Sequence, residues 1–401
     1  MVALRKSLRD AKPGLGTRWY ALAFASGLAI ATSSARAATS FELESYVTDD
    51  QAALAAAGFE PAAFVDPNLI NPWGMSFTST GPFWVSNQGS NTSTLYDGEG
   101  EPQSLIVTIP HAPAGPAGPT GQIFNSSSSF ALASGDPGLF FFANLDGSIS
   151  GWNGDSGTVS EVVVSAGSDA RPAIYTGLAV GNSGGADFLY AANNLTGHVD
   201  VFDSSYASAT LAGDFTDPGA NPDGLVPFNV QNINGLIYVT YAVGGPAADE
   251  APEGSGFVSV FRTDGTFVGR LIDVGVVTSP WGLAIAPEGF GKFSGALLVG
   301  NFHEDLGFIS AFDPDTGELL GTLTDEDGDV ITIPDLWTLL VGNDGAGGDS
   351  DDIYFTAGIG DEAHGLLGEI GAVPLPAALP LLLGALGGLL GFGRRRDRSP
   401  V

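Results

Sequence analysis

The sequence predicts an all-β protein, a six-bladed β-propeller, and three observations lead to this fold. A short segment built around an aromatic residue and a glycine recurs with a period of about 52 residues. Each copy is followed by short runs rich in β-branched and aromatic residues and bounded by Gly, Asp, Asn or Pro, which is typical of strands. No amphipathic helix is recognisable between the two end segments. Six such units fit a propeller, with a β-sandwich or a β-helix as the alternative.

The recurring segment predicts the first strand of each unit. Residues 72–77 read Pro-Trp-Gly-Met-Ser-Phe and residues 280–285 read Pro-Trp-Gly-Leu-Ala-Ile. A third clear copy reads Tyr-Thr-Gly-Leu-Ala-Val at residues 175–180. Weaker copies are expected at 124–130, 228–234 and 336–341. Six first strands define six blades.

The remaining strands follow each first strand in order. Second strands are expected at 83–87, 139–144, 188–193, 237–241, 296–301 and 353–357. Third strands are expected at 93–97, 148–153, 198–203, 257–262, 307–313 and 365–370. Fourth strands are visible at 105–109, 159–164, 267–272 and 318–323. The last unit ends after three strands, so we expect the spare strand 41–48 to complete it and cover its edge.

The start of the chain has the three parts of a secretory signal peptide. Basic residues lie among the first 18, an apolar stretch spans 19–30, and the small residues Ala35 and Ala37 precede a cleavage site after Ala37. The predicted organisation is a signal peptide at 1–37, the propeller at 38–371 and a C-terminal tail at 372–401. The protein is therefore expected to be exported across the inner membrane.

The tail combines a short motif, an apolar run at 378–392 and a basic stop. The motif is Val373, Pro374, Leu375, Pro376 and Ala377, and the stop is Arg394, Arg395 and Arg396. The apolar run before the basic stop predicts a transmembrane helix. This helix is expected to be short, because the run has fewer than the ~20 residues that usually span a membrane. This tail resembles the PEP-CTERM class of bacterial sorting signals, in its VPLPA-CTERM form. The resemblance implies transient membrane anchoring, an exosortase-like sorting protease as partner, and a location in the cell envelope or outside the cell.

Charge and cysteine content exclude several classes of function. The formal net charge is −31, and only Arg171, Arg262, Arg270 and Lys292 are basic between the two end segments. Such a surface repels phosphate backbones, so nucleic acid is excluded as a partner. The absence of cysteine excludes disulfides and thiolate chemistry. The acidic residues either keep an exported protein soluble or recruit Ca²⁺ or another divalent metal, the only cofactor in view.

The fifth unit carries the clearest family likeness. It reads Pro-Trp-Gly-Leu-Ala-Ile, then Leu-Leu-Val-Gly-Asn, then Gly-Phe-Ile-Ser-Ala-Phe-Asp. This order resembles the NHL repeat, and the likeness extends over residues 68–370. Together with the two end signals, the chain resembles a family of exported bacterial NHL-like β-propeller proteins carrying this sorting signal. The resemblance implies a fold and a location, and it implies no established activity.

Four asparagines end corresponding second strands: Asn87, Asn144, Asn193 and Asn301. They either bond to the backbone of the next turn or face the central tunnel as oxygen ligands. The second possibility rests on a resemblance to six-bladed gluconolactonase-type enzymes, which bind a divalent ion there.

Two loops combine histidine with carboxylates, one after the second strand of the fifth unit and one after that of the sixth. The six candidate metal ligands are His303, Glu304, Asp305, Asp361, Glu362 and His364. Neighbouring blades would place both loops on one face, where they could ligate a metal or form an acid–base pair. The alternative is local hydrogen bonding within turns. The acidic segment 325–329 is likewise either a hairpin turn or a Ca²⁺ loop. No catalytic residue is assigned.

The expected function is non-catalytic binding of extracellular polysaccharide or of an envelope protein. Tryptophans in the first strands, such as Trp73 and Trp281, either pack between blades or line the tunnel mouth, where they could stack on sugars. The alternative is a metal-dependent hydrolase or lactonase with its site at the tunnel mouth. A propeller fold does not decide between these functions.

Overall fold

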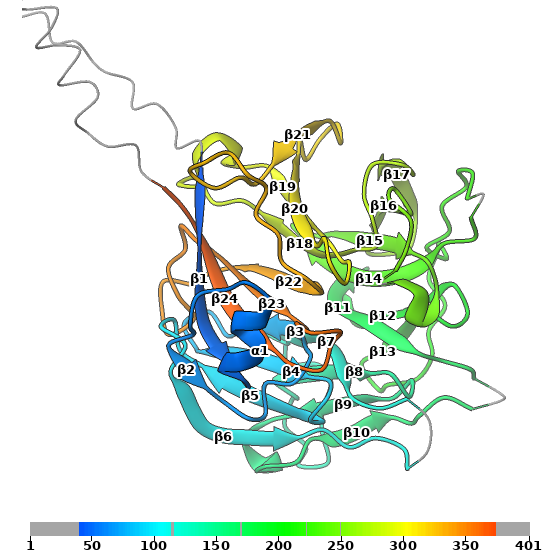
Figure 1. Ribbon diagram of the computed structural model, residues 1–401. Coiled ribbons are helices and arrows are strands. Elements are labelled where there is room, and N and C mark those ends of the chain that lie inside the picture. Colours follow the sequence, from blue (N-terminus) through cyan, green and yellow to red (C-terminus); the bar gives the residue numbers. More distant parts are fainter. Residues whose placement is uncertain (1–39, 114–115, 169–170, 222, 249, 374–401) are drawn as a thin grey trace, which may run out of the picture. The chain divides into compact units, whose positions relative to one another are not determined.

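The computed structural model describes residues 40–373, apart from 114–115, 169–170, 222 and 249. In this part of the chain six β-sheets are arranged around a common axis (Figure 1), which confirms the six-bladed β-propeller. The strands of every sheet are antiparallel to their neighbours, with one exception. The short strand β2 (Phe64–Val65), at the edge of one sheet, is parallel to its neighbour. Among these residues helical structure is confined to α1 (Gln51–Ala56) and three single turns.

The first three sheets follow one another along the chain. Blade one contains β3 (Pro72–Ser76), β4 (Phe83–Asn87), β5 (Thr92–Tyr96) and β6 (Pro102–Thr108). Blade two contains β7 (Pro119–Phe124), β8 (Phe140–Asn144), β9 (Ile149–Trp152) and β10 (Glu161–Val164). Blade three contains β11 (Tyr175–Ser183), β12 (Ala186–Asn193) and β13 (His198–Asp203).

The other three sheets complete the ring. Blade four contains β14 (Val226–Ile233), β15 (Leu236–Ala242), β16 (Gly256–Arg262) and β17 (Phe267–Ile272). Blade five contains β18 (Pro280–Ile285), β19 (Leu297–Asn301), β20 (Phe308–Phe312) and β21 (Leu319–Thr322). Blade six contains β22 (Leu336–Val341), β23 (Ile353–Ala357), β24 (Leu366–Ala372), β1 (Phe41–Thr48) and β2 (Phe64–Val65).

The six first strands form the inner wall of the ring. Each contacts the next, from β3 through β7, β11, β14 and β18 to β22, which contacts β3 again. The recurring glycine makes this close approach possible. A Cβ on Gly74 would lie 2.5 Å from the carbonyl oxygen of Thr120, and a Cβ on Gly282 would lie 2.4 Å from that of Trp337. The repeat therefore conserves space for the neighbouring backbone.

One predicted first strand was wrong. The inner strand of blade two is β7, Pro119–Phe124, and not residues 124–130. Its Pro119-Thr120-Gly121 matches Pro72-Trp73-Gly74, but the glycine is followed by Gln122, where the recognised copies have Met or Leu, and this hides the repeat. Residues after β7 form a loop, in which the Asn125 side chain donates to the Gly138 carbonyl (2.9 Å). The register shift matters because it places Thr120 on the inner wall.

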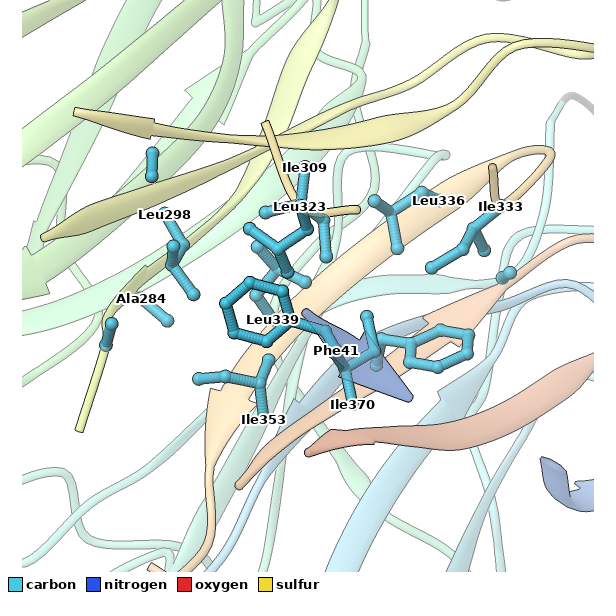
Figure 2. Packing of buried hydrophobic residues seen from close by; sticks show 14 of the residues in the cluster. Phe41, Ala284, Leu298, Ile309, Leu323, Ile333, Leu336, Leu339, Ile353 and Ile370 are labelled. Carbon is cyan, nitrogen blue, oxygen red and sulfur yellow. The ribbon is translucent and has the colours of Figure 1, made fainter. Parts of the chain in front are cut away.

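The prediction that residues 41–48 complete the last blade is confirmed. Strand β1 pairs antiparallel with β24, from Phe41 opposite Ala372 to Thr48 opposite Leu366, as the blue and orange-red strands of Figure 1 show. Figure 2 shows Phe41 within the apolar cluster between blades five and six, among Ile309, Leu336 and Ile370. The parallel strand β2 and helix α1 after β1 were not predicted. Helix α1 begins where Asp50 accepts hydrogen bonds from the amides of Ala52 and Ala53.

The predicted signal peptide and the apolar run of the tail lie outside the described residues. Strand β24 ends at Ala372, immediately before the predicted sorting motif. Within the described part of the chain, no helix is both long and apolar enough to cross a membrane.

Candidate functional site

A cavity of about 330 Å³ lies at one mouth of the central tunnel, and this volume is at the lower end of the range for small-molecule sites. Its wall combines the beginnings of inner strands with loops between second and third strands. Because neighbouring strands of a blade are antiparallel, these two parts of every blade lie on the same face. We call this face the upper mouth. The lining residues used below are Trp73, Thr176, Phe228, Phe302, Trp337 and Glu362.

The aromatic wall follows from the repeat itself. In each inner strand, one residue stands immediately before the position of the recurring glycine. These six residues are Trp73, Thr120, Thr176, Phe228, Trp281 and Trp337. Equivalent positions in six blades converge at the axis, so four aromatic side chains meet there. Phe302, which follows β19, joins them in one buried cluster.

The aromatic rings of the upper mouth are held by contacts with one another and by hydrogen bonds. Trp73 and Trp337 are stacked with ring centroids 3.5 Å apart, and Phe302 lies 4.1 Å from Trp337. The Trp337 indole donates to Asn71 Oδ1 (3.0 Å), and the Asn71 amide donates to Gln88 Oε1 (3.0 Å). These contacts give the wall one fixed arrangement before any ligand arrives, which lowers the entropic cost of binding.

Trp281 lies against the aromatic rings of the upper mouth. Its indole is nearly perpendicular to both Trp73 and Trp337. From β18 it donates to the carbonyl of Thr176 in β11 (3.0 Å), two blades away. Trp281 also lines a second cavity of about 230 Å³, to which all six inner strands contribute. Trp281 therefore connects the aromatic wall of the upper mouth with the lining of the second cavity.

Two buried polar groups of the upper mouth have no hydrogen-bond partner within the described part of the chain. They are the indole nitrogen of Trp73 and the hydroxyl of Thr176. Both residues are more than nine-tenths buried, with exposed fractions of 6% and 4%. Leaving such a group unpaired costs roughly 1–3 kcal/mol. Unpaired groups in the wall of a pocket call for a partner, which a ligand or an ordered water can supply.

Glu362 is the one ionisable side chain among the described residues that line this cavity. It lies in the loop between β23 and β24, where Asp361 and Glu362 both have left-handed backbone angles, with φ of 55° and 59°. The amide of Glu362 donates to the Gly358 carbonyl (2.7 Å), which closes the turn. At the end of the loop, His364 Nδ1 lies 2.9 Å from Asp49 Oδ2.

The structure separates the other candidate metal ligands. His303 Nδ1 accepts from the amides of Asp305 (3.1 Å) and Leu306 (3.3 Å), so its ring caps its own turn. Of the six candidates, only Glu362 lines the cavity. No group of three or more His, Asp or Glu side chains in the described ranges is arranged to hold a metal ion. The metal site therefore stays a prediction without support from this arrangement.

The four asparagines that end second strands act within their own blades. Asn87 donates to Thr94 (2.8 Å), Asn144 to Ser148 (3.1 Å), and Asn301 to the Phe308 carbonyl (3.1 Å). Asn193 donates to Asp200 (3.0 Å). None of the four lines either tunnel cavity. Similarly, Asp325 accepts from the amides of Asp327 and Asp329, as expected for a hairpin turn.

The tryptophans divide between the two predicted roles. Trp84 packs against Phe140 (4.1 Å) and Trp152 (4.7 Å) in the contact between blades one and two. Trp73 and Trp337 line the upper mouth instead. Thr176 and Phe302 were not among the sequence candidates. The position before the recurring glycine is the signal that would have found Thr176.

Two proteins of Acanthamoeba polyphaga mimivirus are similar to this chain over most of its length. The uncharacterized protein R648 is 33% identical over 320 residues, which cover 77% of this chain and 76% of the viral protein. The uncharacterized protein L690 is 31% identical over 321 residues, with coverages of 77% and 82%. The chain belongs to the family of these two proteins. Both relatives are viral proteins. The resemblance of the tail to PEP-CTERM signals implies a bacterial host, and this stays a prediction.

The chain was also compared with protein-family models and with solved structures. No protein-family model matches the chain. The structure of a streptogramin B lyase is 12% identical and covers 84% of this chain and 100% of its own, with a TM-score of 0.48. The PQQ-bound aldose sugar dehydrogenase of Streptomyces coelicolor is 12% identical, with coverages of 83% and 99% and a TM-score of 0.46.

Proposed function

We propose that the protein is a non-catalytic binding module that holds one sugar residue of an extracellular polysaccharide in the upper mouth. The observation that carries this proposal is the aromatic pocket with two unpartnered hydrogen-bonding groups in its wall. A sugar ring has an apolar C–H face that packs on indole rings and hydroxyl groups that would pair with Trp73 and Thr176.

The composition of the pocket favours binding over catalysis. Nucleophilic catalysis requires a nucleophile and a base within hydrogen-bond reach of each other. The described lining offers one hydroxyl, that of Thr176, and one carboxylate, that of Glu362, and they come from different blades. The metal-dependent hydrolase or lactonase, the alternative from the sequence, gains no specific support from these residues.

The Thr176→Val variant tests the proposal because it removes one unpaired hydroxyl and keeps the shape of the side chain. We expect the free energy of unfolding to rise by about 1 kcal/mol, since a buried unpaired hydroxyl is lost. We also expect affinity for the recognised sugar to fall about tenfold, since the ligand loses a hydrogen bond. Chemical denaturation and calorimetric titration of the full-length chain in mild detergent, against a panel of oligosaccharides, measure both.

The matched control is Thr120→Val at the equivalent position of blade two. The Thr120 hydroxyl donates to the Tyr175 carbonyl (2.8 Å), so its removal should lower stability and leave sugar affinity unchanged. A Thr176→Val protein that loses stability, or that binds as tightly as the parent, would contradict the proposal. So would a parent protein that binds no sugar of the panel.

We further propose that this module is exported and sorted at the cell envelope. Support comes from the sequence of residues 1–37 and from the motif at 373–377, which begins directly after the last strand of the propeller. An exosortase-like protease would then release the propeller near Pro374–Ala377. Mass spectrometry of protein recovered outside the cells is expected to find no peptide containing Arg394–Arg396. Recovery of those arginines would make the tail a permanent anchor.

A further inference from the structure

We infer that the recognised sugar carries a free, protonated amine, and this inference rests on the proposed sugar-binding function. Three features of the upper mouth support a cationic ligand: a carboxylate held in its wall, the scarcity of basic side chains on that face, and the aromatic rings. Each feature is independent of the two unpartnered groups that indicate a sugar.

The carboxylate of Glu362 is held in the wall at a conformational cost. Two consecutive non-glycine residues, Asp361 and Glu362, adopt left-handed backbone angles. Such residues cost on the order of 1–3 kcal/mol each and persist where the surrounding structure enforces them, often at functional sites. Here the hydrogen bond to Gly358 and the contact between His364 and Asp49 enforce the turn. The turn therefore keeps an acidic residue at the pocket.

Basic side chains are scarce around the upper mouth. Of the four basic residues that the structure describes, Arg262 ends a third strand and Lys292 lies between a first and a second strand, which places both on the opposite face. Arg270 is paired with Asp217 (2.7 Å). Arg171 donates to Tyr175 Oη (2.8 Å) and to the Gly147 carbonyl (3.1 Å). The net charge of −31 adds a field that attracts cations and repels uronic acids.

An ammonium group also matches the donors and acceptors of the pocket. It offers three N–H donors and no acceptor, so it pairs with the Glu362 carboxylate. The Trp73 indole is a donor only and must meet an oxygen of the sugar. Aromatic rings attract a cation placed over their faces. An N-acetylated sugar lacks the charge, and a neutral hexose has no group that gains comparably from Glu362.

The test compares four ligands of equal length: glucosamine, N-acetylglucosamine, glucose and glucuronate oligosaccharides. Titration calorimetry of the full-length chain at low salt should give about tenfold tighter binding of the glucosamine oligomer than of the neutral oligomers, and no binding of the glucuronate oligomer. The advantage of the amine should shrink as salt is raised. In the Glu362→Gln variant, the glucosamine and glucose oligomers should bind alike.

The Asp361→Asn variant is the matched control because it removes a neighbouring charge on the same turn and because asparagine tolerates left-handed angles. It should retain at least half of the amine preference. Equal binding of glucosamine and glucose oligomers by the parent protein would overturn the inference and leave the proposed function standing. Equal loss of preference in both variants would assign the effect to the general field and overturn the role of Glu362. If no oligosaccharide bound, the proposed function would fall and the inference with it.

Discussion

The two cavities of the tunnel differ in chemistry, although inner strands line both of them: four contribute to the upper mouth and all six to the other cavity. The upper mouth is walled by Trp73, Phe228, Phe302 and Trp337. The other cavity, which Trp281 lines, has amide side chains such as Gln122, Gln231 and Asn232 beside backbone and apolar groups. One repeat thus supplies two different environments, because its positions before and after the recurring glycine vary independently.

The polar groups of the two cavities also differ in their use. Gln231 donates to the Leu283 carbonyl and Asn232 to the Val180 carbonyl, both at 2.9 Å, so these amides join neighbouring blades. The Ser76 hydroxyl, by contrast, lacks a partner among the described atoms. In the upper mouth the indole of Trp73 and the hydroxyl of Thr176 are both unpaired. We infer that the amide side chains of the cavity lined by Trp281 mainly hold neighbouring blades together. The unpaired groups of the upper mouth are instead available to a ligand.

The largest expected difference concerns stability. The Trp337→Ala variant should lower the free energy of unfolding by about 4 kcal/mol, because a large, fully buried ring in contact with four aromatic neighbours is lost. The Gln231→Ala variant in the cavity lined by Trp281 should cost only about 1 kcal/mol, the net value of one hydrogen bond. Denaturant titration of both proteins measures the contrast. Similar losses would mean that the two mouths contribute alike to the ring.

A smaller effect on binding should distinguish the mouth from the core. Replacing Trp73 by Phe keeps most of the ring area and removes the unpaired N–H, so sugar affinity should fall about tenfold. The control is Trp84→Phe, because Trp84 is buried between blades one and two and lines neither tunnel cavity. That variant should leave affinity unchanged. A parallel loss in both variants would show that binding responds to general loosening of the fold.

The scaffold was largely predictable because propeller repeats are written in local patterns. The Pro-Trp-Gly copies and the alternating runs located nearly every strand, and the spare segment at Phe41–Thr48 required a place in an incomplete blade. The failure at β7 has a physical reason. The repeat keeps glycine for close backbone approach in four of the six blades, whereas the residue after it can change, so Gln122 in place of Met or Leu concealed this copy.

The site was less predictable because it depends on which loops and strands meet across the axis. The sequence singled out histidines with carboxylates, but His303 bonds within its own turn and His364 lies against Asp49, which follows β1. Glu362 was predicted as a metal ligand, whereas the structure places it among the residues that line the upper mouth. The pairing of Thr176 in blade three with Trp281 in blade five is a contact over 105 residues that no local pattern reveals.

The smallest expected effect tests whether charge at Asp352, beside β23 of blade six, is independent of charge at the upper mouth. Burial, reinforced by Glu369, raises the pKa of Asp352 to about 7. The Tyr46 hydroxyl of strand β1 donates to the same Glu369 (2.5 Å). The folded protein therefore binds a proton more tightly than the unfolded chain, so stability falls as pH rises from about 4 to about 7 and levels off above that range.

The Asp352→Asn variant should remove this dependence. We expect a flatter stability profile between pH 4 and 7 and a gain at pH 8 of about 1 kcal/mol, a figure kept small because the half-buried carboxyl is screened by solvent. Thermal denaturation across this pH range measures the profile. Sugar affinity at pH 8 should equal that of the parent, because Asp352 precedes β23 and lines neither tunnel cavity. A change in affinity would mean that the charge at Asp352 and the upper mouth are coupled through blade six.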